Sequence, residues 1–201
     1  MSTSHDTGWD GIYHRYPLRR LPWELGRPRE VLVDIVESKR VTPGETLDLC
    51  CGAGTNPVYL AENGFGVTAL DISDRAVELA IEKANLSSVD IDFLIGDFVS
   101  LPFKNEEFGF VFDFGCFHHV EPGNRAAFID GVSRVLESGG AYLMVCFSNK
   151  NGHAMNHFSK EKIVELFGDR FEIGWMNHIS SVEGDSITRY FYEVLMKKPE
   201  T

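Results

Sequence analysis

The chain has 201 residues, of which 43% are hydrophobic and 24% charged, the balance of an ordinary globular domain with a sizeable core. Its 19 Lys and Arg against 30 Asp and Glu give a formal net charge of −11, which disfavours nucleic acids and anionic membranes as partners. No apolar run approaches the roughly 20 residues that span a bilayer, and residues 1–7 lack a leader pattern, so we expect a cytoplasmic protein.

Segments that predict helices alternate along the chain with apolar segments that predict strands. The expected helices cover residues 30–38, 56–63, 73–84, 124–136 and 159–167. The expected strands cover residues 46–51, 66–70, 91–95, 108–114, 141–147, 171–179 and 186–197. Ser73 and Ser159 are expected to cap the helices that follow them, and Gly139 with Gly140 to end the helix before them.

Strands without charges that alternate with helices predict a parallel sheet covered on both faces. Ligands of such sheets bind at the carboxyl ends of the strands, where the strand order reverses. Four segments of chemical interest fall at these ends, namely residues 50–54, 71–72, 96–98 and 113–119. We therefore expect one ligand site along one edge of the sheet.

The turn after the first expected strand has the features of a nucleotide site. Gly52 and Gly54 let the backbone approach a ligand, and the following helix offers its free N–H groups. Asp71 ends the next strand, where a carboxylate accepts hydrogen bonds from ribose hydroxyls. A dinucleotide fingerprint would need a third glycine where Pro57 stands, which leaves an NAD-dependent oxidoreductase as the weaker alternative.

The chain resembles the class I S-adenosylmethionine-dependent methyltransferases. Four motifs carry this resemblance in order, and they read LDLCCGAGTNPVYLAENGFGVTALDIS, IGDFVSLPF, FGFVFDFGCFHHV and VLESGGAYLMVCF. The resemblance implies a three-layer αβα sandwich with a Rossmann-like, mostly parallel seven-stranded sheet and an antiparallel late strand. It also implies S-adenosylmethionine as cofactor and S-adenosylhomocysteine as product. The residues that it implies for cofactor binding in these motifs are Asp48, Cys50, Gly52, Ala53, Gly54, Asp71, Ile72, Asp97, Phe98, Asp113 and Phe114.

Cys50 departs from the family pattern, which usually has glycine at this position. A cysteine fits there if its backbone φ stays negative and its Cβ does not touch the ligand. The chain has four cysteines and no C-x-x-C pair, so we expect buried, reduced thiols and no metal centre. A soft metal or metalloid on the adjacent Cys50 and Cys51 is the alternative.

The segment WDGIYHRYPLRRLPWELGRP, residues 9–28, resembles the N-terminal arm of the thiopurine, thiol and tellurite-resistance type of methyltransferase. In that branch the arm closes over the cofactor. Trp9 and Trp23 would then attract the sulfonium cation, since aromatic faces attract cations. Plain packing of an N-terminal helix is the alternative. We therefore expect a single methyltransferase domain over residues 1–201, with an arm or lid over 1–28 and a Rossmann-like core over 29–201.

The candidates for chemistry at the methyl acceptor are Asp113, His118, His119, His153, His157 and Arg189. Asp113 ends the strand nearest the methyl group, so we expect it to contact the cofactor or the acceptor, and His119 is the second catalytic candidate. His153 and His157 have metal-ligand spacing only if their loop is helical. Arg189 would bind an anionic acceptor or form a salt bridge. A thiol acceptor would need no general base, because a few per cent of it is thiolate at neutral pH.

These features together predict an enzyme that moves a methyl group to a small molecule by in-line displacement, with a thiol, a metalloid or another nucleophile as the candidate acceptors. A methyltransferase-like regulatory protein that binds the cofactor without turnover is the alternative from another class. The oligomeric state and the acceptor itself stay open.

Overall fold

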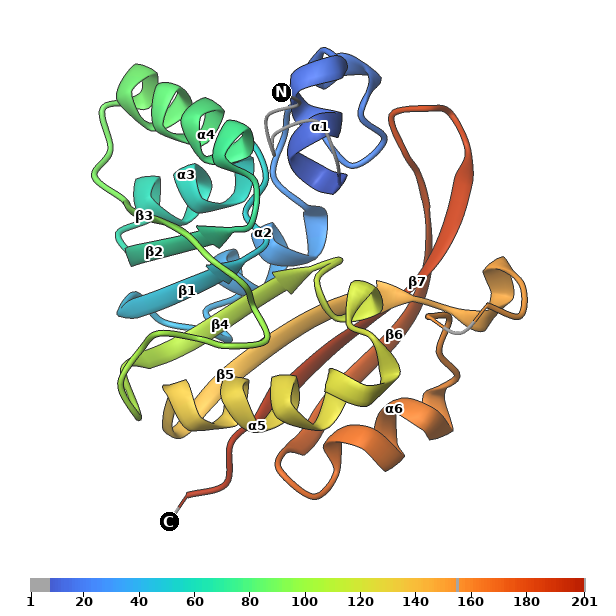
Figure 1. The fold of residues 1–201 in the computed structure, drawn as a ribbon. Helices are drawn as coiled ribbons and strands as arrows, with labels where there is room; N and C mark the ends of the chain where they lie inside the picture. Colours follow the sequence, from blue (N-terminus) through green and yellow to red (C-terminus); the bar gives the residue numbers. More distant parts are fainter. Residues whose placement is uncertain (1–7, 155, 201) are drawn as a thin grey trace.

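The computed structural model describes residues 8–154 and 156–200 (Figure 1). The expectation about residues 1–7 lies outside these residues. Seven strands form one sheet in the order β3-β2-β1-β4-β5-β7-β6. The strands are β1 Glu45–Leu49, β2 Gly66–Asp71, β3 Asp92–Ile95, β4 Phe108–Phe114, β5 Leu136–Phe147, β6 Glu172–Val182 and β7 Thr188–Lys197. β1 to β5 are parallel and β7 is antiparallel to both of its neighbours, which confirms the predicted Rossmann-like sheet.

Helices cover both faces of this sheet and make the three layers that the sequence predicts (Figure 1). The helices are α1 Gly8–Arg15, α2 Glu30–Glu37, α3 Thr55–Glu62, α4 Asp74–Ser87, α5 Arg125–Val135 and α6 Lys160–Phe167. α5 and α6 pack on one face, and α2 and α3 pack on the other, with α4 beside α3. No helix of the described ranges is long and apolar enough to cross a membrane.

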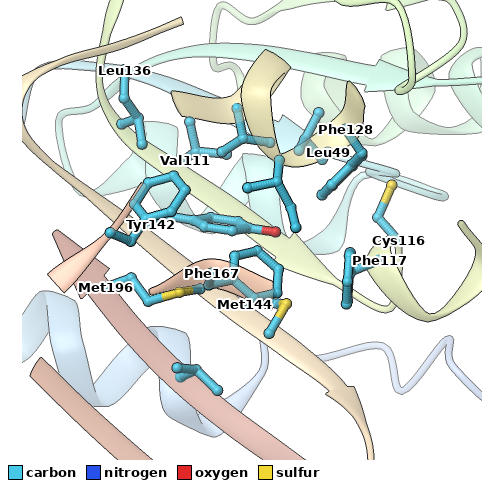
Figure 2. Packing of buried hydrophobic residues seen from close by; sticks show 14 of the residues in the cluster. Leu49, Val111, Cys116, Phe117, Phe128, Leu136, Tyr142, Met144, Phe167 and Met196 are labelled. Atoms are coloured by element: carbon cyan, nitrogen blue, oxygen red, sulfur yellow. The ribbon is translucent and has the colours of Figure 1, made fainter. Parts of the chain in front are cut away.

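Alternation along the central strands fills both hydrophobic cores. Val111 of β4 points toward α5 and α6, whereas its neighbour Phe112 points toward α2 and α3. Successive side chains of a strand leave opposite faces of the sheet, so a strand buried on both sides is apolar throughout. Figure 2 shows the first core, where Phe128 of α5 and Phe167 of α6 lie over β4 and β5. These cores hold the carboxyl ends of β1, β4 and β5 in fixed positions.

Two helix starts follow the predicted capping. The Ser73 hydroxyl accepts a hydrogen bond from the Ala76 N–H, and the Ser159 hydroxyl accepts one from the Lys162 N–H. Each bond satisfies one of the N–H groups that the first turn of a helix leaves without a partner. The Ser73 cap sits directly after Asp71, so it also fixes the chain at the edge where the ligand site is expected.

The prediction that Gly139 and Gly140 end a helix is wrong. α5 ends at Val135 and β5 begins at once with Leu136, so both glycines lie inside the strand. The pairing of β4 with β5 shifts register between Phe108 and Phe110, and the extra residues of β5 form a bulge there. Gly139 has a φ of +76°, and a Cβ on Gly140 would meet backbone oxygens at 2.9 and 3.2 Å. The glycines therefore serve the bulge rather than a helix end.

Candidate active site

One pocket of about 310 Å³ lies at the carboxyl edge of the sheet. The ends of β1, β2, β4 and β5 form its floor, and the N-terminal arm and the β6–β7 hairpin form its sides. The structure brings nine of the predicted site residues to its wall, namely Trp9, Trp23, Cys50, Gly52, Asp71, Ile72, Phe98, Phe114 and His119. The strand ends therefore meet as the parallel topology requires.

The glycine turn after β1 is covered by a carboxylate of the arm. Gly52 has a φ of +55°, and a Cβ there would lie 2.8 Å from the Glu24 Oε1 and from the Tyr13 hydroxyl. The N–H of Ala53 donates a hydrogen bond of 3.1 Å to the same Glu24 oxygen. The absence of a side chain at Gly52 therefore lets Glu24 and Tyr13 of the arm approach the turn closely, whereas the sequence predicted the approach of a ligand.

Asp71 lies on the pocket wall and keeps room for a ligand. Its Oδ2 accepts the N–H of Gly52 and its Oδ1 accepts the N–H of Ser73, both at 2.9 Å. Burial raises the pKa of this carboxyl, and the backbone N–H groups of Ser73, Gly52 and Ile72 oppose that rise. The two oxygens of a carboxylate together accept up to about four hydrogen bonds, so Asp71 retains capacity for a further donor.

Asp48 lies beneath the turn, away from the pocket wall. Its side chain is buried, and its Oδ2 has no hydrogen-bond partner among the described residues. Burial raises the pKa of Asp48 well above its ordinary value, and the nearby carboxyls of Asp113 and Asp71 raise it further. An unpartnered buried acid next to two others fits a site for a positively charged ligand, since a cation would favour the ionised forms.

Asp113, the leading catalytic candidate, lies behind the pocket wall and has no exposed surface. Its Oδ1 accepts the N–H of Cys116 at 2.7 Å, and its Oδ2 accepts the N–H of Phe117 and the hydroxyl of Tyr142. Burial raises the pKa of Asp113 to about 7 against these hydrogen bonds. In this structure the carboxyl holds the start of the loop that carries His118 and His119 through the N–H groups of Cys116 and Phe117.

Three other predicted residues also lie off the wall. Gly54 has a φ of +82° and packs against α4, where a Cβ would lie 2.7 Å from the Cβ of Ala80. Ala53 reaches the site through its N–H alone. Asp97 is exposed, and its Oδ1 accepts the N–H of Val99 at 2.9 Å in a local turn. The absence of a side chain at Gly54 therefore lets the start of α3 pack closely against α4.

Aromatic rings line the part of the pocket beyond the glycine turn. Phe147 stacks on the ring of His118 at 3.9 Å between centroids and on Phe191 at 5.2 Å. His119 meets Trp9 of the arm edge to face at 4.7 Å. Burial lowers the pKa of both histidines, so both imidazoles are neutral at pH 7. This end of the pocket is therefore lined by aromatic rings, and the charged side chains of Arg29, Glu183 and Arg189 lie beside them.

The sequence analysis missed a buried ion pair that joins the arm to the β6–β7 hairpin. Arg29 donates to both carboxylate oxygens of Glu183 at 3.1 Å and to the Trp23 carbonyl at 2.8 Å. Its guanidinium also stacks on Phe114 at 3.5 Å from the ring centroid. These residues are 154 positions apart, so no local pattern could indicate the pair.

The remaining polar candidates are placed by local contacts. Arg189 forms a two-pronged salt bridge with Asp185 at 2.6 and 2.7 Å, which was the alternative to anion binding. A ring nitrogen of His157 lies 2.8 Å from the carbonyl oxygen of Gly152. Within residues 8–154 and 156–200, no group of three or more His, Cys, Asp or Glu could hold a metal ion.

Two expectations about cysteine are wrong. Cys50 and Cys116 form a disulfide, with 5.7 Å between their Cα atoms, whereas Cys51 and Cys146 are free and buried. The partners are 66 residues apart in sequence, but β1 and β4 are neighbouring parallel strands that end at the same edge. Cys50 also has a φ of +54°, not the negative value expected for a residue with a side chain.

The arm, residues 8–28, is fixed on the core by hydrogen bonds. Asp10 accepts the hydroxyl of Ser73 at 2.8 Å and the N–H of Arg75 at 2.9 Å, so it caps the start of α4. The indole N–H of Trp23 donates to the Tyr13 hydroxyl, which in turn donates to Glu24. In this structure the arm therefore covers the pocket.

A doubly wound, mostly parallel sheet with helices on both faces defines an α/β protein of the Rossmann-like class. The sequence profile of a family described as "Methyltransferase domain" matches residues 46–140. The chain is 31% identical over 105 residues to an uncharacterized methyltransferase of Schizosaccharomyces pombe, covering 52% of this chain and 72% of that one. It is 30% identical over 149 residues to "Probable thiol methyltransferase 2" of Arabidopsis thaliana, covering 73% and 64%.

Among solved structures, the N-methyltransferase NodS from Bradyrhizobium japonicum in complex with S-adenosylhomocysteine has a TM-score of 0.73 at 17% identity. The match covers 89% of this chain and 92% of that one. The chain belongs to the class I S-adenosylmethionine-dependent methyltransferases. It spans 50% to 64% of the length of the first three curated relatives that it matches.

Proposed function

We propose that this protein transfers a methyl group from S-adenosylmethionine to a small, uncharged aromatic nucleophile. One observation carries the proposal: a single pocket joins the glycine turn and Asp71 to an aromatic compartment lined by Phe114, Phe147 and Phe191. The first part has the chemistry of a nucleoside site, and the second has the chemistry of an apolar acceptor site.

The cofactor end of the pocket is proposed to hold S-adenosylmethionine, which when bound supplies a methyl group on a positively charged sulfur. Asp71 would accept the ribose hydroxyls, Phe98 would pack on the adenine, and Asp97 would reach its amino group. Asp48 would contribute negative charge from below the turn. Trp9 and Trp23 would cover the cation from the arm, because aromatic faces attract cations by about 0.5–2 kcal/mol.

The acceptor end favours uncharged molecules because its charges are already paired. Arg29 is bonded to Glu183, Arg189 to Asp185, and Arg27 to Glu30. The two histidines there are neutral, because burial lowers the pKa of each. A carboxylate on the acceptor would lose its hydration on entering the pocket and would find no unpaired positive side chain there. Binding of such an acceptor is therefore disfavoured. The net charge of −11 also argues against nucleic acid as the acceptor.

The protein's own contribution to catalysis is alignment and exclusion of water. Orientation of donor and acceptor supplies up to about 7–11 kcal/mol of a displacement barrier. Neutral His119, at the pocket mouth against Trp9, would accept the proton of a hydroxyl acceptor. A thiol acceptor would need no base. The protein would be a single domain, in which residues 1–28 form a lid and residues 29–201 form the core. We place it in the cytoplasm.

The alternative from another class is a cofactor-binding regulatory protein without turnover. Direct titration calorimetry with S-adenosylmethionine, S-adenosylhomocysteine and NAD is the first test. Micromolar binding of the two adenosyl compounds and none of NAD supports the proposal. Binding of NAD, or of none of the three, would overturn it. Cofactor binding with no methylation of any thiol, phenol, selenium or tellurium acceptor would favour the regulatory alternative.

The acceptor class is tested with two aromatic thiols. Thiophenol has no carboxylate, and 4-mercaptobenzoate carries one opposite the thiol. We expect kcat/KM for thiophenol to be at least about tenfold higher, because a buried unpaired charge costs more than 1.4 kcal/mol. Glu183→Gln frees the charge of Arg29 and should move this ratio toward 4-mercaptobenzoate. Glu165→Gln, at the exposed Lys162–Glu165 pair on α6 away from the pocket, is the matched control. Equal values for the two thiols in the wild type would contradict the uncharged class.

A further inference from the structure

Two cysteines meet at the point where the cofactor turn touches the loop after β4. Cys50 follows β1 and lies on the pocket wall, whereas Cys116 follows β4 and is fully buried. We propose that Cys50 and Cys116 are a reversible redox modification site, in which a peroxide joins the two thiols and the disulfide holds the cofactor turn in its binding conformation. The effect on binding rests on the proposed function, but the cysteine chemistry does not.

The positions of the four cysteines support this pairing over others. The two Cα atoms of the pair are 5.7 Å apart, a separation that a disulfide spans. Burial raises the pKa of the Cys51 thiol and of the Cys146 thiol, so both stay protonated and unreactive. Cys50 is the partly exposed member of the pair and lines the pocket, so it is the one that a peroxide reaches first.

The reaction balances with hydrogen peroxide as oxidant. The Cys50 thiolate attacks one peroxide oxygen and hydroxide leaves, which gives a sulfenic acid on Cys50. The Cys116 sulfur then forms the S–S bond, and the sulfenic oxygen leaves as water. Overall the two thiols lose two electrons and two protons, and the peroxide is reduced to two water molecules. A small dithiol or the cellular thiol pool reverses the step by thiol–disulfide exchange.

The backbone of Cys50 explains why the bond would matter for the cofactor. Its φ of +54° lies in the left-handed region, where a residue with a side chain is disfavoured by roughly a factor of ten. The disulfide ties this residue to the loop that Asp113 fixes through the N–H groups of Cys116 and Phe117. When the bond is reduced, the turn is free to leave the left-handed conformation, and the binding-competent fraction falls.

The first experiment maps the thiols and needs no cofactor. The full chain is reduced, freed of reductant, treated with hydrogen peroxide, denatured, alkylated and digested for mass spectrometry. We expect one cross-linked peptide pair, Cys50 with Cys116, and alkylated Cys51 and Cys146. Prior saturation with S-adenosylhomocysteine should slow the cross-link, because the ligand covers Cys50. Four alkylated cysteines, or a different pair, would overturn the redox site.

The second experiment measures the affinity for S-adenosylhomocysteine of the oxidised and the reduced protein by calorimetry. We expect the reduced wild type to bind about tenfold more weakly. Cys50→Gly should bind equally in both conditions, because glycine adopts a positive φ freely. Cys116→Ser should behave like the reduced wild type in both conditions, since it keeps the side chain at residue 50 without the bond.

Equal affinity of the oxidised and reduced wild type would overturn the effect on the turn. Absence of binding in both states would overturn the proposed function and, with it, the effect on affinity. The peptide map would then still decide whether the redox pair exists.

Discussion

Asp113→Asn separates a catalytic role from a positioning role at the end of β4. The carboxyl is fully buried and accepts hydrogen bonds from Cys116, Phe117 and Tyr142, three residues that are labelled in Figure 2. Asparagine keeps the shape and one acceptor oxygen but does not titrate. We therefore expect methyl transfer by Asp113→Asn to stay within about tenfold of the wild type, whereas loss of a general base or of a group that meets the acceptor costs about 10²–10⁴-fold.

The pH dependence of stability gives the quantitative part of this prediction. The folded pKa of Asp113 is about 7, raised from 3.8 by burial, so the folded state holds a proton that the unfolded state has lost between these values. Stability then falls as pH rises from about 4 through about 7. Integration between pH 5 and pH 8 gives a loss of about 2.5 kcal/mol that the variant lacks.

Urea denaturation at pH 5 and at pH 8 measures this difference. The free energy of unfolding of Asp113→Asn minus that of wild type should increase by about 2.5 kcal/mol from pH 5 to pH 8, on top of a constant offset from the altered hydrogen bonds. Asp92→Asn, at the exposed start of β3, is the matched control for loss of a charge. A relative stability that does not change with pH would refute the burial argument.

Three further predictions test other parts of the site. Asp71→Ala should weaken binding of S-adenosylhomocysteine by roughly 10- to 100-fold in calorimetry, since hydrogen bonds to a charged group contribute about 1.5–3 kcal/mol; unchanged affinity would remove the ribose assignment. Gly54→Ala should lower the free energy of unfolding by at least about 2 kcal/mol, because of its φ of +82° and the contact with Ala80, whereas Gly123→Ala, in open space, should not. Because burial lowers the pKa of His119, kcat/KM with a phenol should stay constant from pH 8 to about 6.5 and decrease only at lower pH, where the imidazole gains a proton. In His119→Gln this decrease of kcat/KM at low pH should be absent.

The apolar runs of the sequence predicted the central strands β1, β4 and β5 because these strands are buried on both faces. β4 coincides with its predicted range, 108–114, and the capping serines were both correct. The error at Gly139 and Gly140 has a clear cause. Two glycines after a helix-like segment usually end the helix, and only the pairing of β5 with β4 shows that they form a bulge.

The candidate site was predictable where function depends on strand ends and not where it depends on contacts across the chain. Gly52 and Asp71 follow from local pattern. Glu183 does not, because its partner Arg29 is far away in sequence. The cysteine pair was missed for the same reason, since local spacing rules detect only neighbours.

The three acids at the ends of β1, β2 and β4 cost folding free energy when they are ionised, and the proposed cofactor would offset this cost. Asp48, Asp71 and Asp113 are all buried, and burial raises the pKa of each. Without a positive partner, ionisation of each buried carboxyl lowers the stability of the folded protein, and the three carboxylates repel one another. A cofactor with a positive sulfur and a positive amino group would favour the ionised forms that burial disfavours. The product has lost the sulfur charge, so the same acids would hold it less strongly, and the field that attracts the donor would also favour release of the product.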